Sequence, residues 1–219
     1  MTGRFSRDPC VTHIARWAEQ QGKGLQPDRR EAERFLESLD PDADGFSFRT
    51  FSDTGYTRSG NRDPLEKAIH GSLSDCWDEL VRLNRQGAVI TVTINRTTGE
   101  GRSVADIRRV RALFIDDDLG GDPARLNVAP HIRVETSENH YHYYWRVKDL
   151  PLTLFTEYQQ KLARRYGGDS RVQVVNQSMQ LPGFWRRKAL TRPRLPRLLH
   201  ASQGPPLSQR QVAVLIGSG

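Results

Sequence analysis

Leu113-Phe114-Ile115-Asp116-Asp117-Asp118 is an apolar run that ends in three consecutive carboxylates. The run predicts a buried strand whose packing would hold its acidic end in a fixed place. Because strand side chains alternate between faces, we expect Asp116 and Asp118 to share one face, about 6–7 Å apart along the backbone. Two hard oxygen ligands in that arrangement suit one or two divalent cations. The alternative is a polar turn after the strand, formed with residues 119–122.

Amphipathic and apolar stretches on either side of this run predict the other elements. We expect helices over residues 11–21, 29–39, 153–166 and 208–216, and from Ser72 or Ser74 to about Gly87. We expect strands over residues 46–51, 88–94, 131–136, 140–147 and 195–200. Strands and helices that do not alternate regularly predict an α+β fold with one main sheet.

Length, charge and cysteine usage limit the class of protein. The 219 residues suffice for one substantial domain or two small ones, and the formal net charge is +7. Arginine outnumbers lysine, which favours a nucleic-acid partner; arginine spread over the surface without a function is the alternative. No apolar run is long enough for a membrane span or a signal peptide, so we expect a cytoplasmic protein with no membrane partner. Cys10 and Cys76 stand alone and predict reduced thiols, not a zinc site.

The strand expected over residues 140–147 carries a second group of candidates. By alternation, His140 and His142 share one face, and the other face holds Tyr141, Tyr143 and Trp145. Aromatic side chains that fill one face most simply form core, and a stacking platform for bases is the alternative. A histidine pair next to the carboxylate strand indicates contact with a phosphate or a metal ion. A lone strand histidine would more simply be a satisfied polar group.

A third acid, Asp169, follows two glycines after the helix expected over residues 153–166. Gly167-Gly168 permits a tight chain reversal that can aim the carboxylate inward. With Asp116 and Asp118 it would complete a three-carboxylate set for a two-metal site. The alternative is an ordinary residue at the end of a helix.

Basic residues are concentrated near the end of the chain. Leu181-Pro182-Gly183-Phe184-Trp185 is followed by Arg186, Arg187 and Lys188, and then by Arg192, Arg194 and Arg197. A rigid turn before a basic triplet suits a phosphate clamp for a triphosphate or for template DNA. A solvated basic loop is the alternative.

These elements, in this order, resemble the archaeo-eukaryotic primase superfamily, and within it the plasmid-type (RepB-like) primases and related primase-polymerases. The resemblance covers most of the chain. Its first motif, an apolar strand ending Asp-x-Asp, matches Asp116 and Asp118. Its second, a histidine on the following hairpin, matches His142, and its third, a late carboxylate, matches Asp169. Each motif is weak alone, and the ordered set is specific.

The resemblance implies a nucleotidyltransferase: a template-directed DNA primase or polymerase that acts in replication of a plasmid, phage or mobile element. It implies an RRM-like catalytic sheet, antiparallel or mixed, with an N-terminal α/β module packed beside it. We expect one catalytic domain over residues 1–219, with the N-terminal module at about 1–100, the catalytic module at about 101–200 and a tail or short helix at 201–219. The implied partners are single-stranded DNA template and NTP or dNTP substrates, with a C-terminal helical priming domain, a helicase or other replication proteins as further candidates.

The resemblance also assigns roles to residues. Asp116, Asp118 and Asp169 would hold two Mg²⁺ or Mn²⁺ ions, and His142 would contact the nucleotide triphosphate. Other assigned positions are Ser137, Arg186 and Lys188 for the nucleotide phosphates, and Arg187, Arg192 and Arg194 for DNA. Three positions depart from the family pattern: Gln180 replaces an arginine, Arg186 replaces an asparagine, and Asp117 occupies a usually apolar position.

Two other functions fit parts of the sequence. A DNA-nicking HUH endonuclease would use His140 and His142 as metal ligands and Tyr158 or Tyr166 as the nucleophile. A non-catalytic single-strand-binding module would stack bases on the aromatic face of residues 141–145. The first gives the three acids no required place, and the second leaves them without a function.

Overall fold

The computed structural model describes residues 24–53, 63–117, 123–169, 173–188 and 193–218. Its helices are α2 (Arg29–Leu39), α3 (Leu73–Arg85), α4 (Leu152–Tyr166) and α5 (Gln209–Ile216). Its strands are β1 (Phe46–Ser52), β2 (Lys67–Gly71), β3 (Ala88–Thr93), β4 (Arg96–Thr97), β5 (Ile107–Arg109), β6 (Ala112–Asp117), β7 (Ile132–Ser137), β8 (His140–Arg146), β9 (Ser178–Gln180) and β10 (Arg197–Ala201). Within these residues the named strands pair antiparallel, so the predicted α+β class is confirmed.

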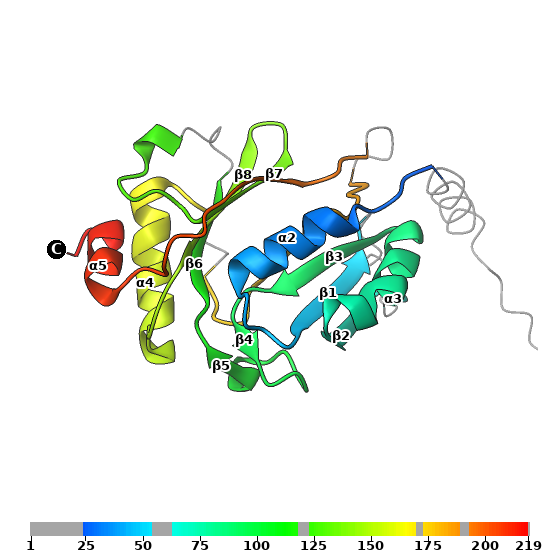
Figure 1. Ribbon diagram of the computed structural model, residues 1–219, viewed down its shortest axis with the longest axis horizontal. Coiled ribbons are helices and arrows are strands. Elements are labelled where there is room, and N and C mark those ends of the chain that lie inside the picture. The colour runs from blue at the N-terminus through cyan, green and yellow to red at the C-terminus, as the bar shows by residue number, and fades with distance from the viewer. Residues whose placement is uncertain (1–23, 54–62, 118–122, 170–172, 189–192, 219) are drawn as a thin grey trace, which may run out of the picture.

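The first sheet has the order β2-β1-β3-β9. Every residue of β3 is buried, which fits its unbroken apolar and β-branched sequence. Both helices near this sheet begin at a capping side chain: Asp28 accepts from the Glu31 N–H at α2, and Ser72 accepts from the Asp75 N–H at α3. Helix α3 packs on β2 and β3, whereas α2 reaches across to β7 and β10 (Figure 1).

The second sheet has the order β10-β7-β8-β6, so β6 is an edge strand. Helix α4 packs against β6, and α5 packs against α4. Both helices lie on the side of this sheet away from the first sheet (Figure 1). Phe35 of α2 meets the ring of Tyr144 in β8 edge-on, with ring centroids 5.4 Å apart. Helix α2 therefore joins the two sheets through a common core.

The observed elements differ from the expected ones in three respects. The chain has two four-stranded sheets instead of one main sheet, because β1 and β3 pair with β2 and β9 and not with β6, β7 or β8. A small β4-β5 ribbon was likewise not predicted. Strand β9 brings residues 178–180 into the first sheet, although most of that sheet comes from residues 46–93. The helix expected over residues 11–21, Cys10, and most of the loop before Pro64 lie outside the described residues.

None of the described helices is long and apolar enough to cross a bilayer. Cys76 is a free thiol in the core, where burial raises its pKa.

Candidate active site

The end of β6 brings an aspartate and a histidine together. The antiparallel register pairs Asp116 with His142 of β8, and residues opposite each other in such a pair share a face of the sheet. Nε2 of His142 lies 3.5 Å from Oδ1 of Asp116. Nδ1 of His142 lies 3.1 Å from the hydroxyl of Tyr144. The imidazole is therefore held between a phenol and a carboxylate.

The charges at this site are set by opposing effects. Burial raises the pKa of Asp116, and the charge of Asp169 raises it further, but the hydrogen bond and charge of His142 outweigh both. The pKa of Asp116 is consequently below its ordinary value, and the carboxyl stays ionised. Complete burial raises the pKa of Tyr144 well above its ordinary value. The phenol therefore stays protonated and can donate a hydrogen bond to Nδ1 of His142. The other ring nitrogen, Nε2, then faces Asp116.

Asp169 lies beside Asp116 because of the turn that follows α4. Gly167 ends the helix in the left-handed conformation, with φ of 72°. A Cβ on Gly168 would come within 2.6 Å of Cγ2 of Ile115, so only glycine lets the turn pass this close to β6. The N–H of Asp169 then donates to the carbonyl of Asp116 at 3.1 Å. The turn is attached directly to the acidic end of the strand.

A glutamine of helix α4 forms hydrogen bonds to the open edge of β6. The N–H of Phe114 donates to Oε1 of Gln159 at 3.3 Å, and Nε2 of Gln159 donates to the carbonyl of Phe114. Both residues are buried, so this amide replaces the partners that a further strand would supply. Gln159 could not be predicted from the sequence, because no local pattern marks a glutamine as the partner of a distant strand.

Asp117, the next acid of the β6 run, differs from Asp116. Asp117 points to the opposite face from Asp116, is fully buried, and forms an ion pair with Arg125. Asp118 lies outside the described residues. In the part of the chain that the structure describes, no group of three or more His, Cys, Asp or Glu side chains forms a metal-binding cluster. The carboxylates of Asp116 and Asp169 are nonetheless the hard oxygen donors that Mg²⁺ and Mn²⁺ prefer, so these residues fit such an ion.

Two of the residues assigned to nucleotide and DNA line the same hollow. Ser137 and Arg194 line one hollow of about 360 Å³ at the end of the β7–β8 hairpin, with Glu135, Thr136, Glu138, Leu195 and Arg197. Arg194 also forms an exposed ion pair with Glu138 at 3.4 Å. Lys188 is exposed, and Arg192 lies outside the described residues.

Arg186 and Arg187 are held by Asp53, which sequence reasoning missed. Nε of Arg186 donates to both carboxylate oxygens of Asp53 at 3.1 and 3.2 Å. Nη1 of Arg186 donates to Oε1 of Gln180 at 3.0 Å, so two of the departures from the family pattern contact each other.

Arg187 requires a correction. Its side chain was expected in a DNA-contacting basic triplet, but the residue is only 3 % exposed. Its guanidinium donates to the carbonyl of Arg85, and its N–H donates to Asp53. Burial lowers the pKa of this guanidinium. These contacts hold the side chain in the interior, so Arg187 is not part of a DNA-binding surface.

Two features count against the other functions. Tyr166, one of the two candidate nucleophiles, is buried and its hydroxyl donates to the carbonyl of Leu215, so this tyrosine does not present a nucleophile to DNA. Tyr158, the other candidate, is half-buried. Tyr143 and Trp145 are fully buried and form core, as the alternation predicts. They do not offer a platform for bases.

Comparison with solved structures identifies the class of fold. The chain resembles the AEP domain of the cyanophage S-2L primase-polymerase, with a TM-score of 0.66 and 20 % identity over 88 % of this chain and 100 % of that one. It also resembles the primase RepB', with a TM-score of 0.62 and 19 % identity over 86 % of this chain and 60 % of that one. The catalytic domain of RepB' in complex with initiator DNA gives a TM-score of 0.62 and 20 % identity, over 87 % and 93 % of the two chains. The fold is thus that of primase and primase-polymerase catalytic domains.

The sequence gives the family. Residues 85–213, more than half of the chain, match the family described as the RepB DNA-primase N-terminal domain. No curated protein sequence matches the chain significantly. The chain belongs to the RepB DNA-primase N-terminal domain family.

Proposed function

We propose that this chain is the catalytic domain of a DNA primase that joins NTPs or dNTPs on a single-stranded DNA template. The single observation that carries the proposal is the bond between the Asp169 N–H and the Asp116 carbonyl, next to the His142 contact. Three candidate residues from three separate segments converge there. Membership of a DNA-primase family supports the reaction, and the RepB' complex with initiator DNA supports DNA as the partner.

Asp116, Asp118 and Asp169 would hold Mg²⁺ or Mn²⁺. Bound cations would neutralise the triphosphate charge and make the attacking 3′-hydroxyl more acidic. Asp116 is suited to this role because its side chain is ionised and 29 % exposed, and so it is reachable from solvent. His142 would donate a hydrogen bond to a phosphate oxygen from Nε2, the ring nitrogen that faces Asp116, and the Tyr144 hydroxyl at Nδ1 fixes the orientation of the imidazole.

The hollow at the end of the β7–β8 hairpin would bind phosphates. Ser137 offers a hydroxyl, and the guanidinium of Arg194 offers charge at the same hollow. Arg186, Lys188 and Arg192 would add salt-sensitive affinity for the nucleotide or the template strand. We further propose that residues 1–219 form one catalytic unit, with modules at about 1–100 and 101–200 and a tail at 201–219. This unit would act in the cytoplasm, in replication of a plasmid, phage or mobile element.

The test is primer synthesis by an Asp116→Asn variant. We expect loss of incorporation of labelled NTPs or dNTPs on single-stranded DNA with Mg²⁺ or Mn²⁺, because the amide keeps the shape of the side chain but not its charge. Circular dichroism should show an intact fold.

The matched control is Asp44→Asn, which removes a carboxylate from an exposed ion pair with Arg96. We expect this variant to keep wild-type synthesis. Primer synthesis at the wild-type rate by a folded Asp116→Asn protein would contradict the proposed site.

A further inference from the structure

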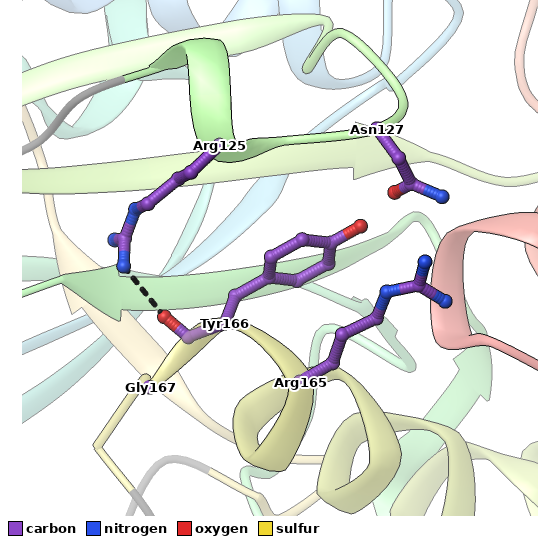
Figure 2. A pocket seen from close by; sticks show the side chains of 5 residues that line it. All are labelled: Arg125, Asn127, Arg165, Tyr166 and Gly167. Atoms are coloured by element: carbon purple, nitrogen blue, oxygen red, sulfur yellow. Dashed lines mark hydrogen bonds between the residues drawn. The ribbon is translucent and has the colours of Figure 1, made fainter.

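A hollow of about 380 Å³ lies between the end of α4, α5 and the short helical turn Pro123–Arg125. Two arginines flank Tyr166 there and point away from each other (Figure 2). Nη1 of Arg165 donates to the carbonyl of Val214 in α5 at 3.2 Å. Nη1 of Arg125 donates to the carbonyl of Tyr166, the last residue of α4, at 2.8 Å. The two arginines of this hollow therefore have different partners: Arg165 contacts α5, and Arg125 contacts the end of α4.

Arg125 has a second partner at the end of β6. Its guanidinium forms an ion pair with the fully buried carboxylate of Asp117. The contact is electrostatic and is not a well-directed hydrogen bond. Asp117 directly follows Asp116, so a single side chain connects the acidic end of β6 to the C-terminus of α4.

These contacts attach the turn 167–169 to β6 at both ends. Before the turn, Tyr166 is tied through Arg125 to Asp117. At the end of the turn, the Asp169 N–H is bonded to the Asp116 carbonyl. Gly168 between them packs on Ile115. Because only two residues separate the two attachment points, Asp169 has little freedom to move relative to Asp116.

We propose that Arg125 and Asp117 are positioning residues that set the spacing of the Asp116 and Asp169 carboxylates, and with it the affinity for divalent cations. The inference rests on the proposed function, in which these carboxylates hold the ions. It gives a role to the buried carboxylate of Asp117, which lies on the opposite face of β6 from Asp116. Outer contacts of this kind typically change metal affinity about 10–100-fold when removed.

The test is Mn²⁺ binding to the full chain, without nucleotide or DNA, followed by electron paramagnetic resonance. We expect Arg125→Met to weaken binding at least about tenfold. The matched control is Arg165→Met, which removes the same charge from the same hollow but leaves the turn attached. Loss of a nearby positive charge alone would strengthen Mn²⁺ binding in both variants. If Mn²⁺ binding is weakened in Arg125→Met but not in Arg165→Met, the effect comes from positioning and not from the loss of charge.

A double variant separates an effect on stability from an effect on positioning. Arg125→Met leaves Asp117 buried without this partner, so we also expect a lower melting temperature. Asp117→Asn combined with Arg125→Met removes both charges, keeps the local net charge and should regain stability. Mn²⁺ binding that stays weak in the folded double variant supports positioning.

Two results would overturn the inference: wild-type Mn²⁺ affinity in Arg125→Met, or its full return in the double variant. Asp116→Asn identifies the site in the same titration. If Asp116→Asn binds Mn²⁺ like the wild type, the proposed metal site itself is wrong. If only Asp116→Asn loses binding, the site is supported and the positioning role is rejected.

Discussion

At the scale of single residues, the site depends on the absence of a side chain at Gly168. A side chain there would have to displace Ile115, whose Cγ2 would lie 2.6 Å from the added Cβ. Ile115 is buried in the strand that ends in Asp116, so it has little room to give way. The close approach lets the Asp169 N–H reach the Asp116 carbonyl.

We expect Gly168→Ala to lower the free energy of unfolding by roughly 1–3 kcal/mol, as for other overpacked sites. It should also weaken Mn²⁺ binding, because the turn must move away from β6. Urea denaturation and the Mn²⁺ titration measure the two effects. Gly24→Ala is the control, since nothing lies within 4 Å of a Cβ at that position. An unchanged stability in Gly168→Ala would mean that the turn can shift without cost.

Part of the candidate site could be proposed from the sequence. Alternation along the apolar run indicated Asp116, the glycine pair indicated Asp169, and the family resemblance selected His142 from the His140/His142 pair. The structure places these three residues next to one another. The side chains that hold them were not predicted, because Arg125, Gln159 and Asp53 act through contacts with distant segments. Arg187 was misplaced for the same reason: a charge run does not reveal which of its members turns inward.

At the scale of elements, the open edge of β6 determines where α4 lies. An edge strand leaves backbone groups without strand partners, and here a buried glutamine amide satisfies both groups of Phe114. Elements with a clear periodicity of apolar residues were predicted closely, and α2 covers the residues expected for it. Strands β2 and β9 were missed because both are short and their pairing depends on β1 and β3; β2 is also partly exposed.

Gln159→Leu should destabilise the fold by roughly 1–3 kcal/mol for each buried group left without a partner. The change keeps the helix propensity and the approximate volume of the side chain, so the loss reports on the edge contact. Gln160→Leu, on the next residue of the same helix, should have a smaller effect because that side chain is only half-buried. Equal unfolding free energies for the two variants in urea would contradict the capping role of Gln159.

At the scale of the whole molecule, a buried ion pair joins the end of α2 to the segment that leads from β5 into β6. Asp40, just after α2, accepts from Nε of Arg111 at 2.6 Å and from Nη2 of Arg109 at 2.7 Å. The guanidinium of Arg111 also lies 4.6 Å from the ring centre of Phe46 in β1. Burial raises the pKa of Asp40, but the two guanidinium groups outweigh it and hold the pKa below its ordinary value of 3.8.

This shift predicts an acid-sensitive stability. Because the folded pKa is below the unfolded value of 3.8, the contribution of Asp40 is complete above that pH and is lost as the pH falls through the folded pKa. Asp40→Asn should cost about 3–5 kcal/mol at neutral pH, since it leaves Arg111 buried without its carboxylate. It should also flatten the fall of the melting temperature below pH 4.

The exposed pair of Asp44 with Arg96 provides the comparison. Asp44→Asn should change stability by no more than about 1 kcal/mol, as for other surface pairs. Melting curves across pH measure both variants. If the melting temperature of Asp40→Asn falls below pH 4 as steeply as that of the wild type, other carboxylates determine the loss of stability in acid.

Strand β9 has a consequence for how the protein is made. The backbone of β3, buried along its whole length, finds its last partner in residues 178–180, which leave the ribosome long after β3 itself. Until then a nascent chain carries an apolar strand with an unpaired side, which invites association with other chains. Synthesis speed between the two segments, and chaperones that shield β3 in that interval, would therefore influence the yield of folded protein.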